Sequence, residues 1–195
     1  MLKTKIMKAW DRIAKEYGAY RRKSWPFLKE FLDNVDDDLL DIGSGHCPNT
    51  RRVMKKGCKL YAVDFSKEML KLAPDEVIKI NSDCTKIPIK RKFKYIAAIS
   101  TLHCLPTEKD KLACLKEINR LLRKGGTALV STWNIRPTGH VVKYWGDIAR
   151  DYYILDKAEI ISLLDKVGFK NYKISTEGTE KGFEIPSNYI IKIKK

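Results

Sequence analysis

The sequence predicts an α/β protein built on a doubly wound sheet of seven strands, mostly parallel and ending in an antiparallel C-terminal hairpin. After Leu39, short apolar runs alternate with helical patterns five times, which is typical of a parallel sheet covered on both faces. No helical pattern separates the last two apolar runs, so these must pair antiparallel, because a parallel crossover needs a dozen or more residues. The stretch "LLDIGSGHCPNT" (Leu39–Thr50) places two glycines directly after the first strand. This arrangement indicates a Rossmann-like sheet with a ligand-binding turn.

The N-terminal region is expected to be helical over residues 1–32. Met7, Trp10, Ile13 and Ala14 follow a helical spacing, and the segment "KSWPF" interrupts it. We expect the 195 residues to form a single domain, in which residues 1–35 are a helical cap and residues 36–195 the Rossmann-like core.

Caps and breakers set the bounds of the remaining elements. Ser66 can cap one helix that Pro74 ends, and Gly57 can close another. Thr107 with Asp110 opens the clearest helix, which the two glycines at 125 and 126 are expected to end. The predicted helices are 49–57, 66–73, 107–126 and 157–169, and the predicted strands are 38–43, 59–64, 77–80, 93–100, 127–133, 170–176 and 187–195, with an irregular stretch from 134 to 156.

Charge is the unusual feature of the composition. Lys and Arg number 39 against 24 Asp and Glu, a net charge of +15. Such a surface attracts polyanions, of which nucleic acid is the leading candidate, although a lysine-rich proteome or adaptation to heat or salt would give the same composition.

The apolar runs and the cysteines exclude other classes. No apolar run is long enough to span a bilayer, and the N-terminal stretch, whose apolar positions are broken by charges, does not resemble a signal peptide. The five cysteines are odd in number and contain no Cys-x-x-Cys, so we expect reduced thiols, a cytoplasmic location and no bound metal.

Acidic residues at the strand ends predict an adenosine pocket. Gly43 and Gly45 allow a ligand to approach the backbone. Asp64, at the end of the second strand, can accept hydrogen bonds from both ribose hydroxyls, although a turn aspartate capping the next helix is the alternative. Asp83 follows the third strand, where it can reach the amine of an adenine.

The residue at position 48 distinguishes between adenosine cofactors. A dinucleotide-binding turn requires a third glycine there, but this chain has Pro48, which has no N–H to donate to a pyrophosphate. S-adenosylmethionine carries adenosine without a pyrophosphate, and its sulfonium suits nearby oxygens, including those of Asp41. The expected cofactor-binding residues are Asp41, Gly43, Ser44, Gly45, Asp64, Phe65, Asp83, Cys84, Ser100 and Leu102.

The region from Leu39 to Trp133 resembles class I S-adenosylmethionine-dependent methyltransferases, with "EINRLLRKGGTALVSTW" as their typical helix, turn and strand. The chain is also similar to the tRNA methyltransferases that esterify a 5-carboxymethyl group on the wobble uridine. The segments "WDRIAKEYGAYRRKSWPFLKEFL", "ISTLHCL" and "RDYYILDKAEI" carry this resemblance. Two departures occur: His103–Cys104 stands where the family has two histidines, and Tyr152–Tyr153–Ile154 where it has Tyr-Tyr-His. A substrate that differs in detail from the family's is therefore open.

Roles in the reaction are expected for a few residues outside the cofactor set. Arg21 and Lys23 could orient a carboxylate or grip phosphates, or could simply be solvated charges at a helix end. Trp25 could stack on a splayed base or belong to the core. His103, just past the fourth strand, could donate a hydrogen bond, act as a base, or cap the strand end. We assign Arg21 and His103 to catalysis, and the expected substrate-binding residues are Lys23, Trp25, Trp133 and Tyr152.

The resemblance implies O-methylation of a carboxymethyl group on the wobble uridine, with the tRNA anticodon loop as partner. It also implies a small zinc-ribbon activator protein docked on the edge strand 77–80, whose apolar side chains are protected by a single lysine, unless a loop or helix covers them. A small-molecule O-methyltransferase acting on a quinone or carboxylic acid and a non-catalytic RNA-binding module are the alternatives.

Overall fold

The computed structural model describes residues 2–21, 23–177 and 187–195. Its helices are α1 (Leu2–Tyr20), α2 (Lys29–Asp33), α3 (Lys67–Lys71), α4 (Glu108–Leu121) and α5 (Lys157–Val167), and its strands are β1 (Leu39–Ile42), β2 (Leu60–Asp64), β3 (Ile78–Asn81), β4 (Phe93–Ile99), β5 (Leu122–Trp133), β6 (Gly139–Trp145), β7 (Ile148–Ile154), β8 (Asn171–Glu177) and β9 (Asn188–Lys194). The connection between β8 and β9, expected to carry a glycine, lies outside the described residues.

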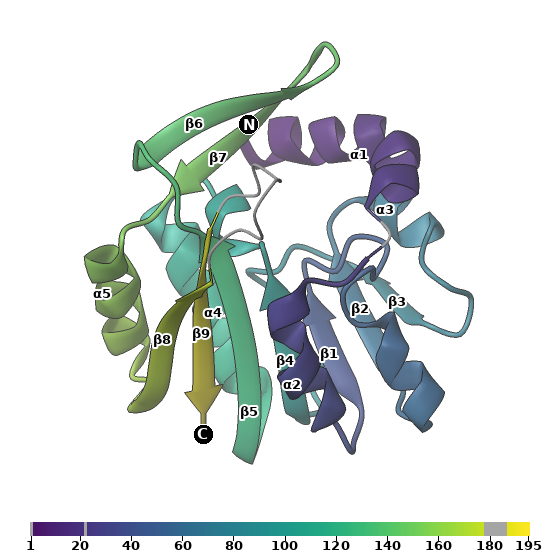
Figure 1. Cartoon of the computed structure of the whole chain (residues 1–195), viewed down its shortest axis with the longest axis vertical. Coiled ribbons are helices and arrows are strands. Elements are labelled where there is room, and N and C mark those ends of the chain that lie inside the picture. Colours follow the sequence, from purple (N-terminus) through teal and green to yellow (C-terminus); the bar gives the residue numbers. More distant parts are fainter. Residues whose placement is uncertain (1, 22, 178–186) are drawn as a thin grey trace.

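A seven-stranded sheet forms the centre of the molecule (Figure 1), in the order β3-β2-β1-β4-β5-β9-β8. β1 pairs in parallel with β2 and β4, whereas β9 runs antiparallel to both β5 and β8. All four residues of β1 are buried, as a central strand covered on both faces requires. The predicted fold class, including the antiparallel C-terminal hairpin, is confirmed.

Two hydrophobic cores cover the two faces of the sheet. Leu115 and Ile118 of α4 pack with Ile160 of α5 against one face. On the other face, Phe31 and Leu32 of α2 pack with the neighbouring 3-10 turns and with α3. These helices, α2 to α5, pack on the faces of the sheet and do not cover the carboxyl ends of the parallel strands, where ligands bind in sheets of this type.

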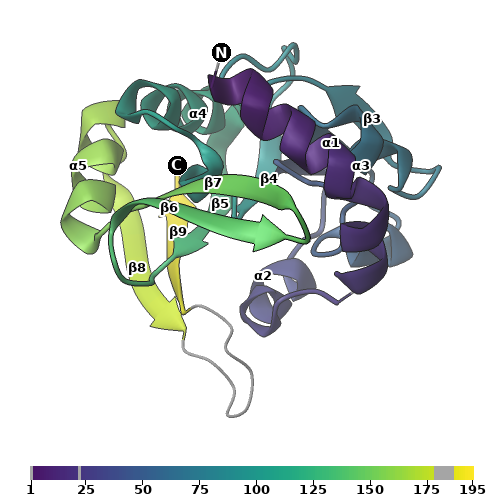
Figure 2. The ribbon, with the colours of Figure 1, turned by 90° about the horizontal axis from the view of Figure 1, so that it is seen from above.

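A long helix and a hairpin lie across those carboxyl ends (Figures 1 and 2). Ile13 and Ala14 of α1 pack on Met69 of α3 and against Trp145 and Ile148 of the β6–β7 hairpin. The stretch from 134 to 156 was predicted to be irregular, and for most of its length this is wrong, since β6 and β7 pair from end to end. Between them lies a two-residue Gly-Asp turn with Gly146 at φ +56°, a recognised hairpin signal.

Two predicted helices also differ from their observed forms. The expected helix 107–126 ends at Leu121, because the backbone becomes extended at Leu122, which is fully buried and pairs beside Phe93 at the start of β5. The expected helix 49–57 is a 3-10 helix over Arg51–Lys56, closed by Gly57 in the left-handed conformation. Within the described ranges, no helix combines the length and the apolar character that a membrane crossing requires.

Candidate functional site

A cavity of about 310 Å³ lies at the carboxyl ends of the strands, beneath α1 and the β6–β7 hairpin. It brings together most of the residues that the sequence predicts for the cofactor and the substrate. Those that line it are Arg21, Trp25, Gly43, Ser44, Gly45, Asp64, Phe65, Asp83, Cys84, Ser100, His103, Trp133 and Tyr152.

In the turn after β1, Gly43 and Gly45 are required for different reasons. A Cβ on Gly43 would collide with the side chain of Thr101, whose Oγ1 donates a hydrogen bond to the Ile42 carbonyl (2.9 Å). At Gly45, which has φ +55°, no described atom lies within 4 Å of where a Cβ would sit. Gly43 therefore lets two strand ends approach each other, and Gly45 leaves room for a ligand at the backbone.

Asp64 lies at the end of β2, facing this turn. Its carboxylate accepts hydrogen bonds from the backbone N–H groups of Gly45 and Ser66 (2.8 Å each). Burial raises the pKa of Asp64 to about 6, despite those two hydrogen bonds. The carboxylate is thus held against the glycine turn as an acceptor that neutral pH keeps ionised.

Asp83 and Ser100 add polar groups at the neighbouring strand ends. Asp83 accepts hydrogen bonds from Thr85 N–H (2.8 Å) and from Lys3 Nζ (2.9 Å). Ser100, directly after β4, has φ +60°, which is uncommon for a residue other than glycine and is characteristic of functional sites. Its buried Oγ has no hydrogen-bond partner among the described residues and lines the cavity.

Asp41, Leu102 and Lys23 do not line the cavity. The buried Asp41 carboxylate accepts a hydrogen bond from Thr50 Oγ1 (2.6 Å), and burial raises its pKa to about 7. Leu102 belongs to the core and Lys23 is exposed. Their assigned roles stay predictions, and the structure gives them no direct place in the pocket.

His103 lies between an aromatic ring and the end of β5. Its ring stacks on Trp133 (centroids 4.5 Å apart), and Trp133 stands 4.5 Å from Tyr152. Nδ1 accepts a hydrogen bond from the Trp133 N–H (3.1 Å), so the ring proton lies on Nε2. Burial, together with the charge of Lys111, lowers the pKa of His103 to about 3. His103 is therefore a neutral hydrogen-bond donor and too weak a base to remove protons at neutral pH.

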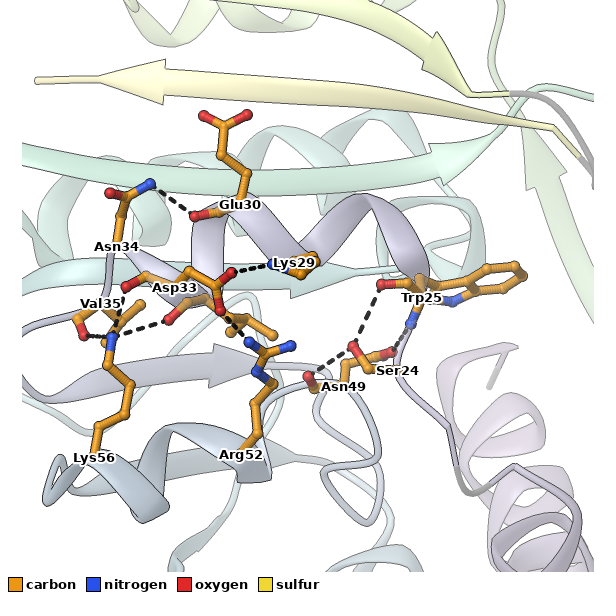
Figure 3. A network of polar contacts seen from close by, with 11 residues as sticks. Ser24, Trp25, Lys29, Glu30, Asp33, Asn34, Val35, Asn49, Arg52 and Lys56 are labelled. Atoms are coloured by element: carbon orange, nitrogen blue, oxygen red, sulfur yellow. Dashed lines mark hydrogen bonds and ion pairs between the residues drawn. The ribbon is translucent and has the colours of Figure 1, made fainter.

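Trp25 is positioned by a polar network that ties residues 24–35 to the segment after β1 (Figure 3). Ser24 Oγ donates to the Asn49 carbonyl (3.1 Å), and Arg52 forms an ion pair with Asp33. Lys56 Nζ donates to backbone carbonyls at the end of α2, including that of Asp33 (2.8 Å). This anchored segment holds the Trp25 ring under the Arg21 guanidinium, whose Cζ lies 4.1 Å from the ring centroid.

The cavity residues that were not predicted include four aromatic side chains and an arginine from α1 and the β6–β7 hairpin: Trp10, Tyr17, Tyr20, Trp145 and Arg150. The rings of Tyr17 and Tyr20 meet Trp145 edge to face, with centroids 5.6 and 5.5 Å apart. This contact joins α1 to β6, two elements distant in sequence. The Gly146–Asp147 turn would have revealed the hairpin, but no local signal indicates that the hairpin folds over the pocket.

The polar groups that line the cavity fit S-adenosylmethionine. Asp64 and Asp83 supply carboxylate acceptors for an adenosine, Gly45 leaves its backbone approachable, and Ser100 presents a buried hydroxyl without a described partner. The cavity is of the size that small cofactors occupy. No described group of three or more His, Cys, Asp or Glu side chains could hold a metal ion.

Comparison with known proteins agrees with this geometry. Residues 40–130 match a family model described as "Methyltransferase domain". A relative from Xenopus tropicalis, the tRNA (carboxymethyluridine(34)-5-O)-methyltransferase alkbh8, is 29% identical over 133 residues, which are 66% of this chain and 21% of the relative. A Schizosaccharomyces pombe protein named tRNA (carboxymethyluridine(34)-5-O)-methyltransferase is 24% identical over 152 residues, 76% of this chain and 66% of that protein. The chain thus spans only about a fifth of the Xenopus protein's length.

Solved structures share the fold at low sequence identity. The DhpI complex with S-adenosylhomocysteine superimposes with a TM-score of 0.74 at 17% identity, covering 99% of this chain and 96% of that one. A methyltransferase described as S-adenosylmethionine-dependent, from Methanosarcina mazei, gives a TM-score of 0.70 at 17% identity, covering 88% and 98% of the two chains. Residues 40–130 therefore match a methyltransferase domain, in a chain that has the fold of the S-adenosylmethionine-dependent methyltransferases.

Proposed function

We propose that this chain is an S-adenosylmethionine-dependent methyltransferase that O-methylates a carboxymethyl group on the wobble uridine of tRNA. The observation that carries the proposal is that one cavity joins the acidic strand ends to the residues Arg21, Trp25 and His103. The relatives named as tRNA carboxymethyluridine methyltransferases support the choice of acceptor.

The side chains suit a carboxylate acceptor. S-adenosylmethionine supplies a methyl group on its sulfonium sulfur, and transfer forms a C–O bond to the acceptor while the C–S bond breaks and leaves its electron pair on sulfur. No proton has to be removed from a carboxylate, so a site whose histidine is a neutral donor meets the need. Cys104 is no alternative nucleophile, because burial raises its pKa to about 12. Arg21 and His103 Nε2 are left to orient the acceptor.

A tRNA substrate is supported by charge and by aromatic side chains at the pocket. The net charge of +15 favours a polyanion, and Tyr20, which lines the cavity and is 72% exposed, offers a ring on which an extruded base can stack. Trp25 already has the Arg21 guanidinium over its ring, so a base would have to displace that contact. Such a substrate also fits the cytoplasmic location that the cysteines predict.

The test uses the purified chain with methyl-labelled S-adenosylmethionine and tRNA carrying 5-carboxymethyluridine. Label should enter the wobble nucleoside, as identified by mass spectrometry, and mild alkali should release it, because methyl esters hydrolyse readily. Arg21→Ala should lower the transfer rate and leave cofactor affinity intact, whereas Lys23→Ala should change RNA affinity only. Label in an alkali-stable position, or none in tRNA, would rule out this reaction.

A small carboxylic acid is the second candidate acceptor. The cavity is covered by α1 and the β6–β7 hairpin, which contact each other through Tyr17 and Trp145, and a partly covered cavity suits a small substrate. Labelling of small aromatic acids in preference to tRNA would favour this candidate.

We also propose that the edge strand β3 docks a small zinc-ribbon activator protein. β3 pairs only with β2 within the described part of the sheet, and the Ile78 side chain is 37% exposed. Lys79 lies near Asp75 (3.7 Å), so this edge has little free charge to prevent pairing. Co-expression with such a partner should raise solubility or activity, and Ile78→Lys should abolish the gain without changing cofactor affinity. A soluble chain that is fully active on tRNA alone would exclude the partner.

A further inference from the structure

Two arginines from distant elements line the same cavity near Tyr17. Arg21 follows α1 and Arg150 lies on β7, and both line the cavity. Burial raises the pKa of Tyr17, and the positive charges of Arg21 and Arg150 both oppose that rise. Direct contacts agree, since the Arg21 backbone N–H donates to the Tyr17 carbonyl (2.8 Å) and the Tyr17 ring lies 5.6 Å from that of Trp145, which Arg150 Cζ approaches to 5.6 Å.

Neither guanidinium is neutralised. Arg21 Nη2 and Arg150 Nε are buried and have no hydrogen-bond partner in the part of the chain that the structure describes. No described carboxylate forms an ion pair with either residue. Asp151, the neighbour of Arg150, is instead engaged by Lys5 Nζ (2.9 Å) and His140 Nε2 (2.9 Å), as expected for a side chain on the other face of the strand.

Aromatic rings surround the two positive charges. Arg150 Cζ lies 5.5 Å from the ring centroid of Trp10 and 5.6 Å from those of Trp145 and Tyr152. Cation–π contacts hold the guanidinium in place but do not satisfy a buried N–H donor. Buried donors without acceptors are costly, so this end of the cavity is prepared for an anion that brings its own oxygens.

We propose that Arg21 and Arg150 form an anion-binding subsite for the acceptor's carboxylate, and that Arg150 sets the preference for a charged acceptor over a neutral one. The choice of carboxylate rests on the proposed function. A planar carboxylate presents two oxygens to a guanidinium fork and fits between ring faces. Phosphate could be held by the same donors, so the experiment includes it.

The experiment measures binding by calorimetry in the presence of S-adenosylhomocysteine. The probes are 5-carboxymethyluridine and its neutral amide, phenylacetate and phenylacetamide as a ring-CH2 pair without a nucleoside, and inorganic phosphate. Arg150→Gln is compared with the wild type and with Lys143→Gln. Lys143 lies opposite Arg150 in the β6–β7 register, is exposed and does not line the cavity, so its variant matches the charge change.

The wild type and Lys143→Gln should bind each acid about tenfold or more tightly than its amide, and Arg150→Gln should lose this preference. Unchanged affinity for S-adenosylhomocysteine shows that the variant is folded, and Arg150→Lys, which keeps the charge without the fork, should fall between the two. A preference retained in Arg150→Gln would overturn the subsite. Phosphate binding that exceeds carboxylate binding and depends on Arg150 would overturn the carboxylate assignment. If tRNA is not methylated but phenylacetate binding still requires Arg150, the proposed function fails and the subsite stands.

Discussion

At the scale of single residues, we expect Asp64 to couple cofactor binding to pH. Burial raises its pKa to about 6, and we propose that its ionised form accepts hydrogen bonds from the ribose hydroxyls. Affinity for S-adenosylhomocysteine should therefore be constant above about pH 7 and fall as the pH decreases through about 6. Asp64→Ala should weaken binding about tenfold or more at neutral pH, as calorimetry would measure.

Asp75→Asn is the matched control for this prediction, since Asp75 is fully exposed and lies away from the cavity. It should reproduce the wild-type pH profile, whereas Asp64→Asn should bind weakly and show no such transition. An Asp64→Ala variant with wild-type affinity would contradict the placement of the ribose at β2.

We expect Asp41 to make the stability of the chain depend on pH. Its pKa in the folded state is about 7, above its ordinary value, so ionisation is harder in the folded chain than in the unfolded one. The contribution of Asp41 to the free energy of unfolding should therefore be greatest at low pH and be lost as the pH rises through about 7. Asp41→Asn removes the charge, and its amide oxygen can still accept from Thr50 Oγ1.

Thermal unfolding of the cofactor-free chain from about pH 5 to about pH 8 would measure this effect. The Asn variant should be the more stable protein at the alkaline end, by at most about 4 kcal/mol for a shift of about three pKa units. Parallel unfolding curves for the two proteins would show that Asp41 is not the titrating group.

At the scale of elements, α1 presents a basic stripe on its outer face. Lys5, Lys8, Arg12 and Lys15 are spaced three or four residues apart and are exposed. Lys5 and Arg12 pair with hairpin aspartates, at 2.9 Å from Asp151 and 3.1 Å from Asp147. We expect the stripe to contact the RNA backbone near the cavity, with Lys8 and Lys15 as its main contributors.

Reversing both charges, in a Lys8→Glu and Lys15→Glu double variant, should weaken tRNA binding about tenfold at low salt and reduce the salt dependence of the affinity. The matched control reverses Lys170 and Lys173, which are exposed at the β8 edge of the sheet. Filter binding at several salt concentrations would measure the tRNA affinity of both double variants. Equal losses in both double variants would mean that total charge, and not the stripe, drives binding.

The elements also show what sequence reasoning could reach. Hydrophobic period and chain connectivity predicted the mostly parallel sheet with its antiparallel C-terminal hairpin, and they placed Asp64 and Asp83 at strand ends, because these features follow from local pattern and the geometry of parallel strands. Arg150 and Trp145 could not be found this way. Their roles depend on a hairpin that folds back onto α1. The sequence of this short hairpin contains no hydrophobic pattern from which its packing partner could be predicted.

The end of α4 illustrates a different limit. Gly125 and Gly126 were expected to stop the helix, yet the chain leaves it at Leu122 to bury that side chain beside Phe93. Tertiary burial thus overrides a local stop signal, and Gly125 uses its φ of +75° inside an extended segment instead.

At the scale of the whole molecule, the cavity has two electrically different ends. Asp64 and Asp83, the latter paired with Lys3 (2.9 Å), line the end where we propose the cofactor. Arg21 and Arg150 line the proposed acceptor end without acidic partners in the described chain. A cation and an anion are therefore drawn to opposite ends of one space, in the order that methyl transfer requires.

This polarity predicts how turnover ends. Esterification removes the negative charge that the two arginines recognise, so the chain should hold its product less firmly than its substrate. The methyl ester of 5-carboxymethyluridine should compete at least about tenfold less well than the acid for the wild-type chain, and equally well for Arg150→Gln. An ester that inhibits as strongly as the acid would contradict this. The unpaired guanidinium donors would then act twice in each catalytic cycle. They would first bind the carboxylate of the substrate, and after esterification they would favour release of the product, because its neutral ester no longer pairs with them.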